Sequence, residues 1–137
     1  MPIIKIGIVD DHDLVRTSLS KIISDISPEF IITMQCSNGM ELIDNLPGLP
    51  VEQRPNIILT DLNMPIMDGY ETTVWVKKHF QEIGVIVLST RDDPNTVARL
   101  REAGASGFMA KNITADDLVE AFRAVATGGT YYKVSES

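Results

Sequence analysis

The segment with the strongest structural signal is Ile57-Ile58-Leu59-Thr60-Asp61-Leu62-Asn63-Met64-Pro65-Ile66-Met67-Asp68-Gly69. Its opening apolar run is typical of a strand that is buried on both faces of a parallel sheet. Met64-Pro65 prevents that strand from continuing, and Asp68-Gly69 opens the next segment of helical periodicity. Asp61 is therefore predicted at the carboxyl end of a central strand, in the crevice where open α/β sheets bind their ligands. By itself, the same residue is equally compatible with a carboxylate that only ends a strand or caps a helix.

Four further apolar segments are predicted as strands, and a segment with helical spacing follows each strand along the chain. The strands are expected at residues 3–9, 30–36, 85–88 and 107–110. The helices are expected at residues 13–26, 40–46, 69–80, 94–103 and from Thr114 to the Gly128-Gly129 pair. Regular alternation of this kind predicts an α/β fold with a doubly wound, five-stranded parallel sheet and helices on both faces. The expected fold is flavodoxin-like, with strand order 2-1-3-4-5.

Composition limits the class of protein. The chain has 137 residues, the length of one domain, and its 44% hydrophobic content is enough for a core. A net charge of −7 argues against direct binding to nucleic acid, which needs clustered Lys and Arg side chains, but is compatible with a cation site made of carboxylates. The single cysteine, Cys36, excludes an internal disulfide and is expected in the core. No leader peptide or membrane-spanning run is recognisable, so we expect a cytoplasmic protein without a membrane partner.

Polar side chains are predicted at the carboxyl ends of four strands. Asp10 and Asp11 follow the first strand, Asp61 the third, Ser89 the fourth and Lys111 the fifth. In a doubly wound sheet these ends converge where the strand order reverses. Three neighbouring carboxylates repel one another unless a cation joins them, and oxygen ligands suit Mg²⁺. A carboxylate with Mg²⁺, a Lys and a hydroxyl around it can receive a phosphoryl group, because carboxylates form acyl phosphates.

Each of these residues also has a purely structural interpretation. Ser89 is then a strand-end hydroxyl, and Lys111 is a solvated surface residue. His12 follows the acidic pair, and we interpret it as a surface residue at a helix start, because Mg²⁺ prefers oxygen ligands. Trp75 is about 100° around its helix from Val76, which marks the buried stripe, so we expect a partly exposed ring that covers a neighbouring side chain.

The chain resembles a two-component response-regulator receiver domain, and the resemblance extends from residue 3 to about residue 129. The motifs that carry it are Val9-Asp10-Asp11-His12, Thr60-Asp61-Leu62-Asn63-Met64-Pro65 with Asp68-Gly69, Leu88-Ser89 and Gly104-Ala105-Ser106-Gly107-Phe108-Met109-Ala110-Lys111. Each motif is weak alone, but all of them occur in order at the expected strand ends. The resemblance implies that Asp61 is the phosphoacceptor and that Ser89 and Lys111 bind the phosphoryl oxygens.

For the metal, the resemblance implies Mg²⁺ or Mn²⁺, with Asp11 and Asp61 as side-chain ligands. Asn63 would add its backbone carbonyl, and Asp10 matches an acidic partner that often reaches the metal through water. Ser89 and Phe108 match the residues that switch when receivers are phosphorylated. The aromatic switch residue is often Tyr, and Phe lacks the hydroxyl, so switching here would depend on burial of the ring.

Among receivers, the chain is most like the NarL/FixJ type. The features that carry this likeness are Asp-Asp-His near the start, Ser37-Asn38-Gly39, Lys111-Asn112 and the segment Ala126-Thr127-Gly128-Gly129-Thr130-Tyr131-Tyr132. The type implies a receiver domain at 1–129 and the start of a linker at 130–137, which would lead to a C-terminal helix-turn-helix domain outside this chain. DNA would be bound only through that domain. The connection at 46–55 is longer than the pattern of the family.

The leading functional hypothesis is a switch that accepts a phosphoryl group from a sensor histidine kinase and forms a homodimer in response. Such a domain is not an enzyme, apart from self-phosphorylation by phosphodonors and slow autodephosphorylation. One alternative is an aspartyl-nucleophile phosphohydrolase of the haloacid-dehalogenase type, but such enzymes need a general acid where this chain has Asn63. The other is a pseudo-receiver that only binds partners. Such domains usually lack an acidic residue or the Lys, and this chain has all of them.

Overall fold

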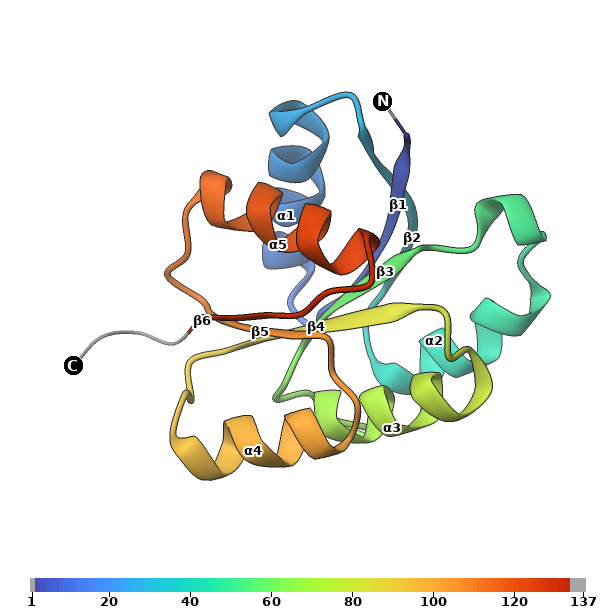
Figure 1. The fold of residues 1–137 in the computed structure, drawn as a ribbon. Coiled ribbons are helices and arrows are strands. Elements are labelled where there is room, and N and C mark those ends of the chain that lie inside the picture. The colour runs from blue at the N-terminus through green and yellow to red at the C-terminus, as the bar shows by residue number, and fades with distance from the viewer. Residues whose placement is uncertain (1, 134–137) are drawn as a thin grey trace.

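Residues 2–133 are described by the computed structural model, in which strands and helices alternate along the chain (Figure 1). One sheet contains six parallel strands in the order β2-β1-β3-β4-β5-β6. The strands are β1 (Ile4–Val9), β2 (Phe30–Cys36), β3 (Ile57–Asp61), β4 (Gly84–Ser89), β5 (Gly107–Ala110) and β6 (Tyr131–Lys133). The helices are α1 (Asp13–Ile26), α2 (Gly39–Asn45), α3 (Gly69–His79), α4 (Pro94–Glu102) and α5 (Ala115–Ala126).

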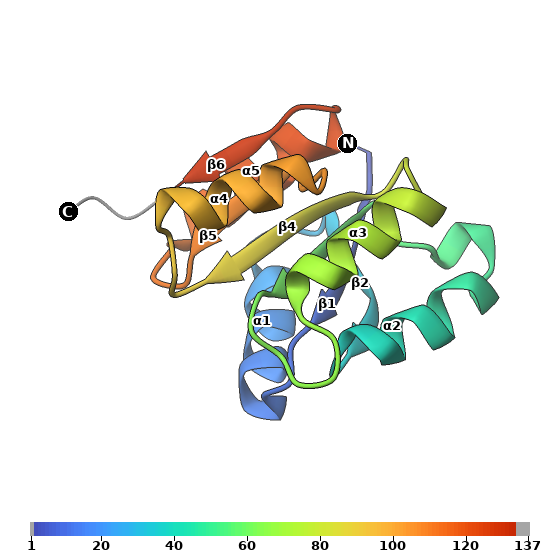
Figure 2. The same ribbon diagram turned by 90° about the horizontal axis from the view of Figure 1, so that it is seen from below.

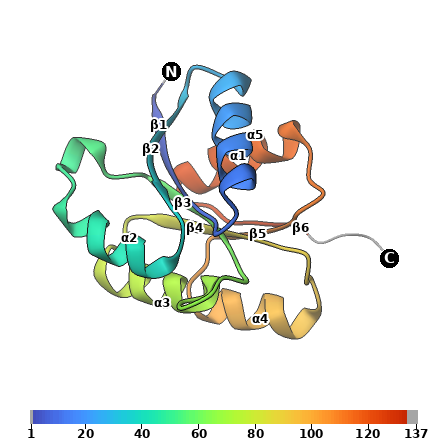
Figure 3. The same cartoon turned by 180° about the vertical axis from the view of Figure 1, so that it is seen from behind.

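The helices cover both faces of the sheet. α1 and α5 pack on one face, and α2, α3 and α4 lie on the other (Figure 1, Figure 3). Figure 2 shows this second layer from below, with α3 between its contact partners α2 and α4. The flavodoxin-like α/β fold predicted from the sequence is therefore confirmed, including the order of the first five strands.

The predicted strand count of five is wrong, because Tyr131–Lys133 add β6 beside β5. α5 ends at Ala126, and Gly128, two residues later, has a φ of +89°, in the left-handed region that glycine adopts readily. The chain then turns back, and Gly107 pairs with Tyr131 in a parallel register. The expected linker at 130–137 therefore begins inside the sheet, and its residues 134–137 lie outside the described part of the chain. The boundary between domain and linker stays a prediction.

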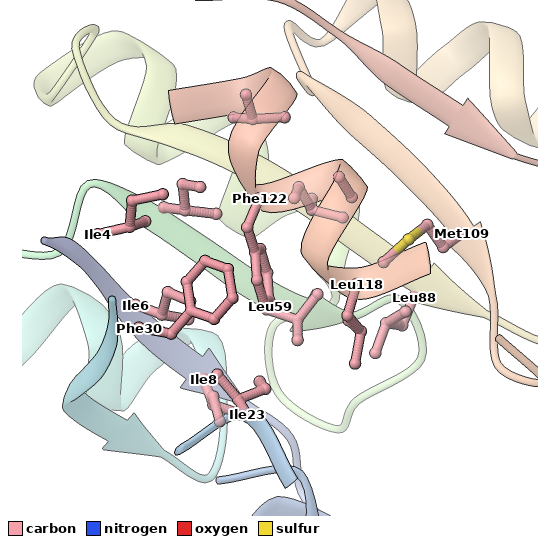
Figure 4. Packing of buried hydrophobic residues seen from close by; sticks show 14 residues of the cluster. Ile4, Ile6, Ile8, Ile23, Phe30, Leu59, Leu88, Met109, Leu118 and Phe122 are labelled. Atoms are coloured by element: carbon pink, nitrogen blue, oxygen red, sulfur yellow. The ribbon is translucent and has the colours of Figure 1, made fainter. Parts of the chain in front are cut away.

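Two apolar layers hold the helices to the sheet. Beneath α1 and α5, Phe30 and Phe122 meet edge to face with ring centroids 5.3 Å apart (Figure 4). The opposite layer contains Phe108 and Cys36, both fully buried. β3, β4 and β5 are buried along their whole length, since helices cover both of their faces. Cys36 is thus the core residue predicted from the sequence.

Side-chain caps explain where most of the helices begin. Asp68 and Glu71 form a capping box at the start of α3, and Thr114 and Asp117 form another at the start of α5. The second of these was predicted from the sequence. Asp93 caps α4 by accepting a hydrogen bond from the backbone N–H of Thr96 at 3.1 Å.

The long connection between α2 and β3 is compact. It contains two single 3₁₀ turns, Leu46–Gly48 and Val51–Gln53, with the Leu46 side chain fully buried. On the neighbouring α3, Trp75 is partly buried and stacks on His79 at 4.5 Å between ring centroids, as expected for a ring that covers a neighbour. No helix among residues 2–133 is both long and apolar enough to cross a membrane.

Candidate functional site

Three aspartates meet where β1 and β3 end. These strands are neighbours, and Val9 pairs with Thr60, so the residues that follow this pair lie at one edge of the sheet. Asp10 and Asp61 are buried, and Asp11 is partly buried. One ligand atom from each aspartate and one from His12 all lie within 4.8 Å of one another. The structure therefore brings together the carboxylates that the sequence predicted to converge.

The carboxyl group of Asp61 lies in surroundings that disfavour its charge. Burial raises its pKa above the ordinary value, and the charges of Asp10 and Asp11 raise it further. Lys111 acts in the opposite direction, but the net shift in pKa is upward. A cation bound here, or a reaction that changes the charge of this carboxylate, would reduce the unfavourable free energy of keeping a negative charge in a buried position.

Two oxygens of the acidic group keep lone pairs that a ligand can use. Asp11 Oδ1 and Asp61 Oδ1 are buried, and neither has a hydrogen bond from residues 2–133. Lys111 Nζ lies 3.0 Å from Asp61 Oδ1 as an ion pair. Buried carboxylate oxygens usually have partners. A small divalent cation that prefers oxygen ligands, such as Mg²⁺, fits this donor set.

The start of α1 holds Asp10 in place. Asp10 Oδ1 accepts a hydrogen bond from the backbone N–H of His12 at 2.8 Å, and the Asp10 carbonyl accepts one from the Arg16 guanidinium at 2.6 Å. The same guanidinium donates to Asp13 Oδ1 at 2.6 Å. Asp10 therefore has fixed partners, whereas Asp11 Oδ1 does not.

Lys111 and Ser89 reach the same edge of the sheet from β5 and β4. The backbone N–H of Lys111 donates to the Ser89 carbonyl at 3.2 Å, which ties the two strand ends together. The Ser89 side chain is fully buried, and its Oγ accepts a hydrogen bond from the backbone N–H of Arg91 at 2.9 Å. Its hydroxyl proton remains a donor for an oxygen acceptor.

Asn63 and Phe108, the other two predicted residues, occupy contrasting environments. Asn63 is exposed and lies two residues after Asp61 in the loop between β3 and α3. Phe108 is fully buried in the core beneath α2, α3 and α4. In the sheet it pairs with Val87 on β4 and with Tyr132 on β6. A change in the position of its ring would therefore alter the packing of both neighbouring strands.

Gly69 sets how closely α3 approaches the end of β3. Its backbone N–H donates to the Leu62 carbonyl at 2.7 Å, and a Cβ at this position would lie 2.4 Å from the Asp61 carbonyl oxygen. Only glycine permits that approach. In the same loop, Ile66 has a φ of 72°, which is unusual for a β-branched residue, and its side chain is exposed. The loop after Asp61 is thus held in a specific shape.

Two features of the site were not predicted from the sequence. His12 is the N-cap residue of α1 and 64% of its side chain is exposed, as expected for a surface residue at a helix start, but its Nδ1 also lies 3.4 Å from Asp10 Oδ1 and 3.3 Å from Asp11 Oδ1. A cavity of about 130 Å³ beside the site is lined by Asn63, Arg91 and Arg99, among others. The position of His12 directly after the acidic pair was the available signal, but the direction of its side chain depends on how α1 begins.

The fold and the site together define a class of protein. Residues 6–123 match the response regulator receiver domain family, and this chain belongs to that family.

Individual similar proteins show which members of this family the chain resembles. The transcriptional regulatory protein DegU from Brevibacillus brevis is 37% identical over 128 residues, which cover 93% of this chain and 52% of DegU. The signal receiver domain of NarL from Mycobacterium tuberculosis has a TM-score of 0.83 at 25% identity, covering 93% of this chain and 99% of that one. The RcsB receiver domain from Salmonella enterica, solved with the phosphomimetic BeF₃⁻, has a TM-score of 0.82 at 25% identity, covering 96% of this chain and 94% of that one. The predicted likeness to NarL-type regulators is confirmed, and the chain spans about half the length of DegU.

Proposed function

We propose that the chain is a phosphorylation switch in which Asp61 accepts a phosphoryl group from a sensor histidine kinase. A carboxylate oxygen of Asp61 attacks the phosphorus, the P–N bond of the donor phosphohistidine breaks, and the donor imidazole keeps the electron pair. The observation that carries the proposal is the group of Asp10, Asp11 and Asp61 with ligand atoms within 4.8 Å, next to Lys111. Family membership supports the same reading of these residues.

The cation in this proposal is Mg²⁺, with Mn²⁺ as a substitute. Asp11 and Asp61 hold it through their side chains, Asn63 through its backbone carbonyl and Asp10 through a water molecule. When bound, the cation offsets the negative charge of the transferring phosphoryl oxygens. The buried oxygens of Asp11 and Asp61 that have no hydrogen bond from residues 2–133 support this assignment.

In this proposal, Lys111 and Ser89 bind the phosphoryl oxygens. Changes in the positions of Ser89 and Phe108 then transmit phosphorylation to the rest of the domain. The Lys111 ammonium group already lies against Asp61, and the Ser89 hydroxyl has a proton to donate. Movement of Ser89 at the end of β4 alters the packing of Val87, two residues earlier, against Phe108. Phe108 has no hydroxyl to be exposed, so the switch acts through the packing of the ring.

We propose the output of the domain, regulation of transcription, from relatives that are longer than this chain. The receiver domain occupies residues 1–129, and a linker that begins at 130–137 leads to a C-terminal helix-turn-helix domain that binds DNA. Phosphorylation promotes a homodimer, and the whole protein regulates transcription in the cytoplasm. The support is the 52% coverage of DegU, whose printed name is that of a transcriptional regulator.

The domain acts as a switch and not as a phosphohydrolase. A hydrolase of the haloacid-dehalogenase type needs a general acid two residues after its nucleophile, and the Asn63 amide cannot donate a proton in that way. The reactions that remain are self-phosphorylation by small phosphodonors and slow hydrolysis of the acyl phosphate.

Labelling with isotopic acetyl phosphate tests the assignment of Asp61. We expect about one phosphoryl group per wild-type chain with Mg²⁺, and none in chelator or in Asp61→Asn. Asp25→Asn is the matched control, because Asp25 is an exposed aspartate on α1 that pairs with Lys21 at 3.4 Å. It should label like wild type. Label retained by Asp61→Asn would place the phosphoacceptor elsewhere.

A further inference from the structure

The long connection between α2 and β3 forms part of the wall of a cavity at the end of the sheet opposite the acidic site. The cavity has a volume of about 240 Å³, and the side chains around it include Lys5, Arg54, Asn56 and Glu82. Lys5 lies near the start of β1, and Asn56 directly precedes β3, whereas the acidic site lies where these two strands end. The proposed function uses none of these residues.

Arg54 brings a positive charge to this cavity without an acidic partner. Its guanidinium lies over the Phe80 ring, 5.3 Å from the ring centre, and forms no ion pair with a carboxylate of residues 2–133. Its Nε is buried and has no hydrogen-bond acceptor in the same part of the chain, although buried nitrogen donors usually have one. Stacking covers a face of the planar guanidinium and leaves its N–H edge for an acceptor in the same plane.

Lys5 and Asn56 add further donors to the cavity. The Lys5 ammonium group donates to the Glu52 carbonyl at 3.0 Å, which leaves protons for other acceptors. Asn56 Oδ1 accepts a hydrogen bond from the Lys5 backbone N–H at 2.8 Å, so the amide nitrogen of the Asn56 side chain remains a donor. Donors from β1, from the connection and from the residue before β3 are thus collected around one cavity.

The charge around the cavity is positive, although the chain as a whole carries a net charge of −7. Glu82 is the acidic residue among the described side chains that line it, and it is exposed. Burial lowers the pKa of the nearby Lys77, and the negative charge of Glu82 opposes that shift, so these two charges interact. Lys5 and Arg54 therefore face a single carboxylate whose field Lys77 partly cancels.

We propose that this cavity binds a small oxyanion, a carboxylate or a phosphate, with Arg54 as its principal contact and Lys5 and Asn56 as further donors. A guanidinium and an oxyanion of either kind form paired, charge-assisted hydrogen bonds in one plane. Pockets for drug-sized ligands usually measure about 300–1,000 Å³, so a cavity of about 240 Å³ suits a small anion. The bound anion joins the connection to the starts of β1 and β3, and it stabilises the folded state because the unfolded chain has no such site.

Titration with inorganic phosphate and, separately, with succinate tests the site, in chelator and at constant ionic strength. Arg54→Gln should bind the preferred anion about tenfold or more weakly than wild type, because it loses a pair of charge-assisted hydrogen bonds. Lys5→Gln should weaken binding less, since the Lys5 ammonium group already has one acceptor. Lys21→Gln is the matched control, because it removes one positive charge from an exposed position on α1, and it should bind like wild type. Equal affinity in wild type and Arg54→Gln, or no binding of either anion, would overturn the proposal.

Nuclear magnetic resonance of the wild-type protein locates the anion without a variant. The anion should shift the signals of the Arg54 Nε–H and of the Asn56 side-chain amide, and leave the backbone amide of Lys111 in place. An anion that shifts the Lys111 signal and not that of Arg54 would be bound at the acidic site, which contradicts the proposal. A stronger response to phosphate than to succinate identifies a phosphate ligand, and the reverse order identifies a carboxylate.

Labelling by acetyl phosphate with Mg²⁺ separates this inference from the proposed function. Arg54→Gln should take up label like wild type, because Arg54 and Asp61 lie at opposite ends of the sheet, and uptake also shows that the variant is folded. A protein that binds an anion through Arg54 but is never labelled supports the anion site and rejects phosphorylation. A protein that is labelled, but whose Arg54 signal responds to neither anion, supports phosphorylation and rejects the anion site.

Discussion

At the scale of single residues, Asp61 is a buried carboxyl group with two neighbouring carboxylates and one ion pair, to Lys111. Its pKa is raised by burial and by two neighbouring carboxylates, and Lys111 offsets only part of that effect. The folded state therefore carries a charge that would be more favourable in the unfolded chain. Carboxyl groups with a raised pKa are common at functional sites, because a bound ligand or a reaction can remove the unfavourable charge interaction.

We therefore expect Asp61→Asn to stabilise the metal-free protein at pH 7, by about 0.5–2 kcal/mol, the usual range for a stabilising substitution. A carboxyl group whose pKa is raised in the folded state disfavours folding at every pH at which it is ionised in both the folded and the unfolded state. The effect fades as the pH falls toward and below the unfolded value near 3.8, where both states hold the proton. Urea unfolding in chelator at several pH values measures this, with Asp25→Asn as the control. A variant less stable than wild type at pH 7 would contradict it.

Lys111 and Ser89 should contribute unequally to the phosphorylated state. A charge-assisted contact is worth roughly 1.5–3 kcal/mol, against about 1 for a neutral hydrogen bond. Lys111→Ala should therefore weaken the coupling between phosphorylation and dimerisation more than Ser89→Ala does. Lys111→Ala should still take up label, because the proposed nucleophile and the proposed metal ligands remain. Labelling and sedimentation on the same samples test this, and a labelled Lys111→Ala that associates like wild type would show that Lys111 is only a surface residue.

At the scale of secondary-structure elements, β6 pairs with β5 beside Phe108, the residue proposed to act in the switch. Tyr132 pairs with Phe108, its hydroxyl donates to the Ala105 carbonyl, and the Arg101 guanidinium lies 3.9 Å from the centre of its ring. Lys133 adds an ion pair with Asp117 on α5 at 2.8 Å. The start of the predicted linker is thus in direct contact with the strand that carries Phe108.

Tyr132→Phe should loosen β6 without unfolding the domain. The substitution removes the hydrogen bond to Ala105, at a cost of about 1 kcal/mol, and keeps the ring beneath Arg101. The backbone N–H of Tyr131 donates to the Ser106 carbonyl at 2.9 Å, so its exchange with solvent reports whether β6 is paired. We expect this amide to exchange about fivefold faster in the variant, with the amides of α1 unchanged. Unchanged exchange at Tyr131 would mean that backbone pairing alone holds the strand.

At the scale of the whole molecule, the sheet connects the acidic site to surfaces on both of its faces. β3 and β4, which carry Asp61 and Ser89, are buried between the two helical layers. A change at these strand ends can reach the surface through the packing of those layers and through the exposed loops that follow the strands. The two states of the switch must differ in their affinity for a partner, because a ligand shifts an equilibrium only by its differential affinity.

Phosphorylation should therefore change self-association. Saturation with Mg²⁺ and beryllofluoride is expected to raise the dimer fraction of wild type in sedimentation experiments. Asp61→Asn should stay at the level of untreated protein, because its side chain cannot ligate the phosphoryl mimic in the same way. A wild-type protein that remains monomeric under saturating conditions would speak against dimerisation by this domain.

Sequence patterns were enough to predict the framework of the fold and the convergence of most residues of the candidate site. Strands such as Ile57–Asp61 are continuous apolar runs, because both of their faces are buried, and this makes them recognisable without tertiary information. The strand ends then place Asp10, Asp11, Asp61, Ser89 and Lys111 at one edge, since parallel strands point the same way. The capping box at Thr114 could also be predicted from the sequence, because its hydrogen bonds join residues that are close together in the chain.

Tertiary structure alone decided β6, the position of the His12 ring and the approach of Gly69 to Asp61. Tyr131–Lys133 contains no apolar run, and these residues form a strand because the edge of β5 is available to them after the turn at Gly128. The His12 ring lies beside the carboxylates because α1 begins directly after them. Gly69 is required because the start of α3 packs against the backbone of Asp61, eight residues earlier in the chain. β6 and the approach of Gly69 depend on atoms that folding brings together, whereas the His12 ring lies next to its sequence neighbours in a direction set by how α1 begins. Local sequence patterns encode none of these distances.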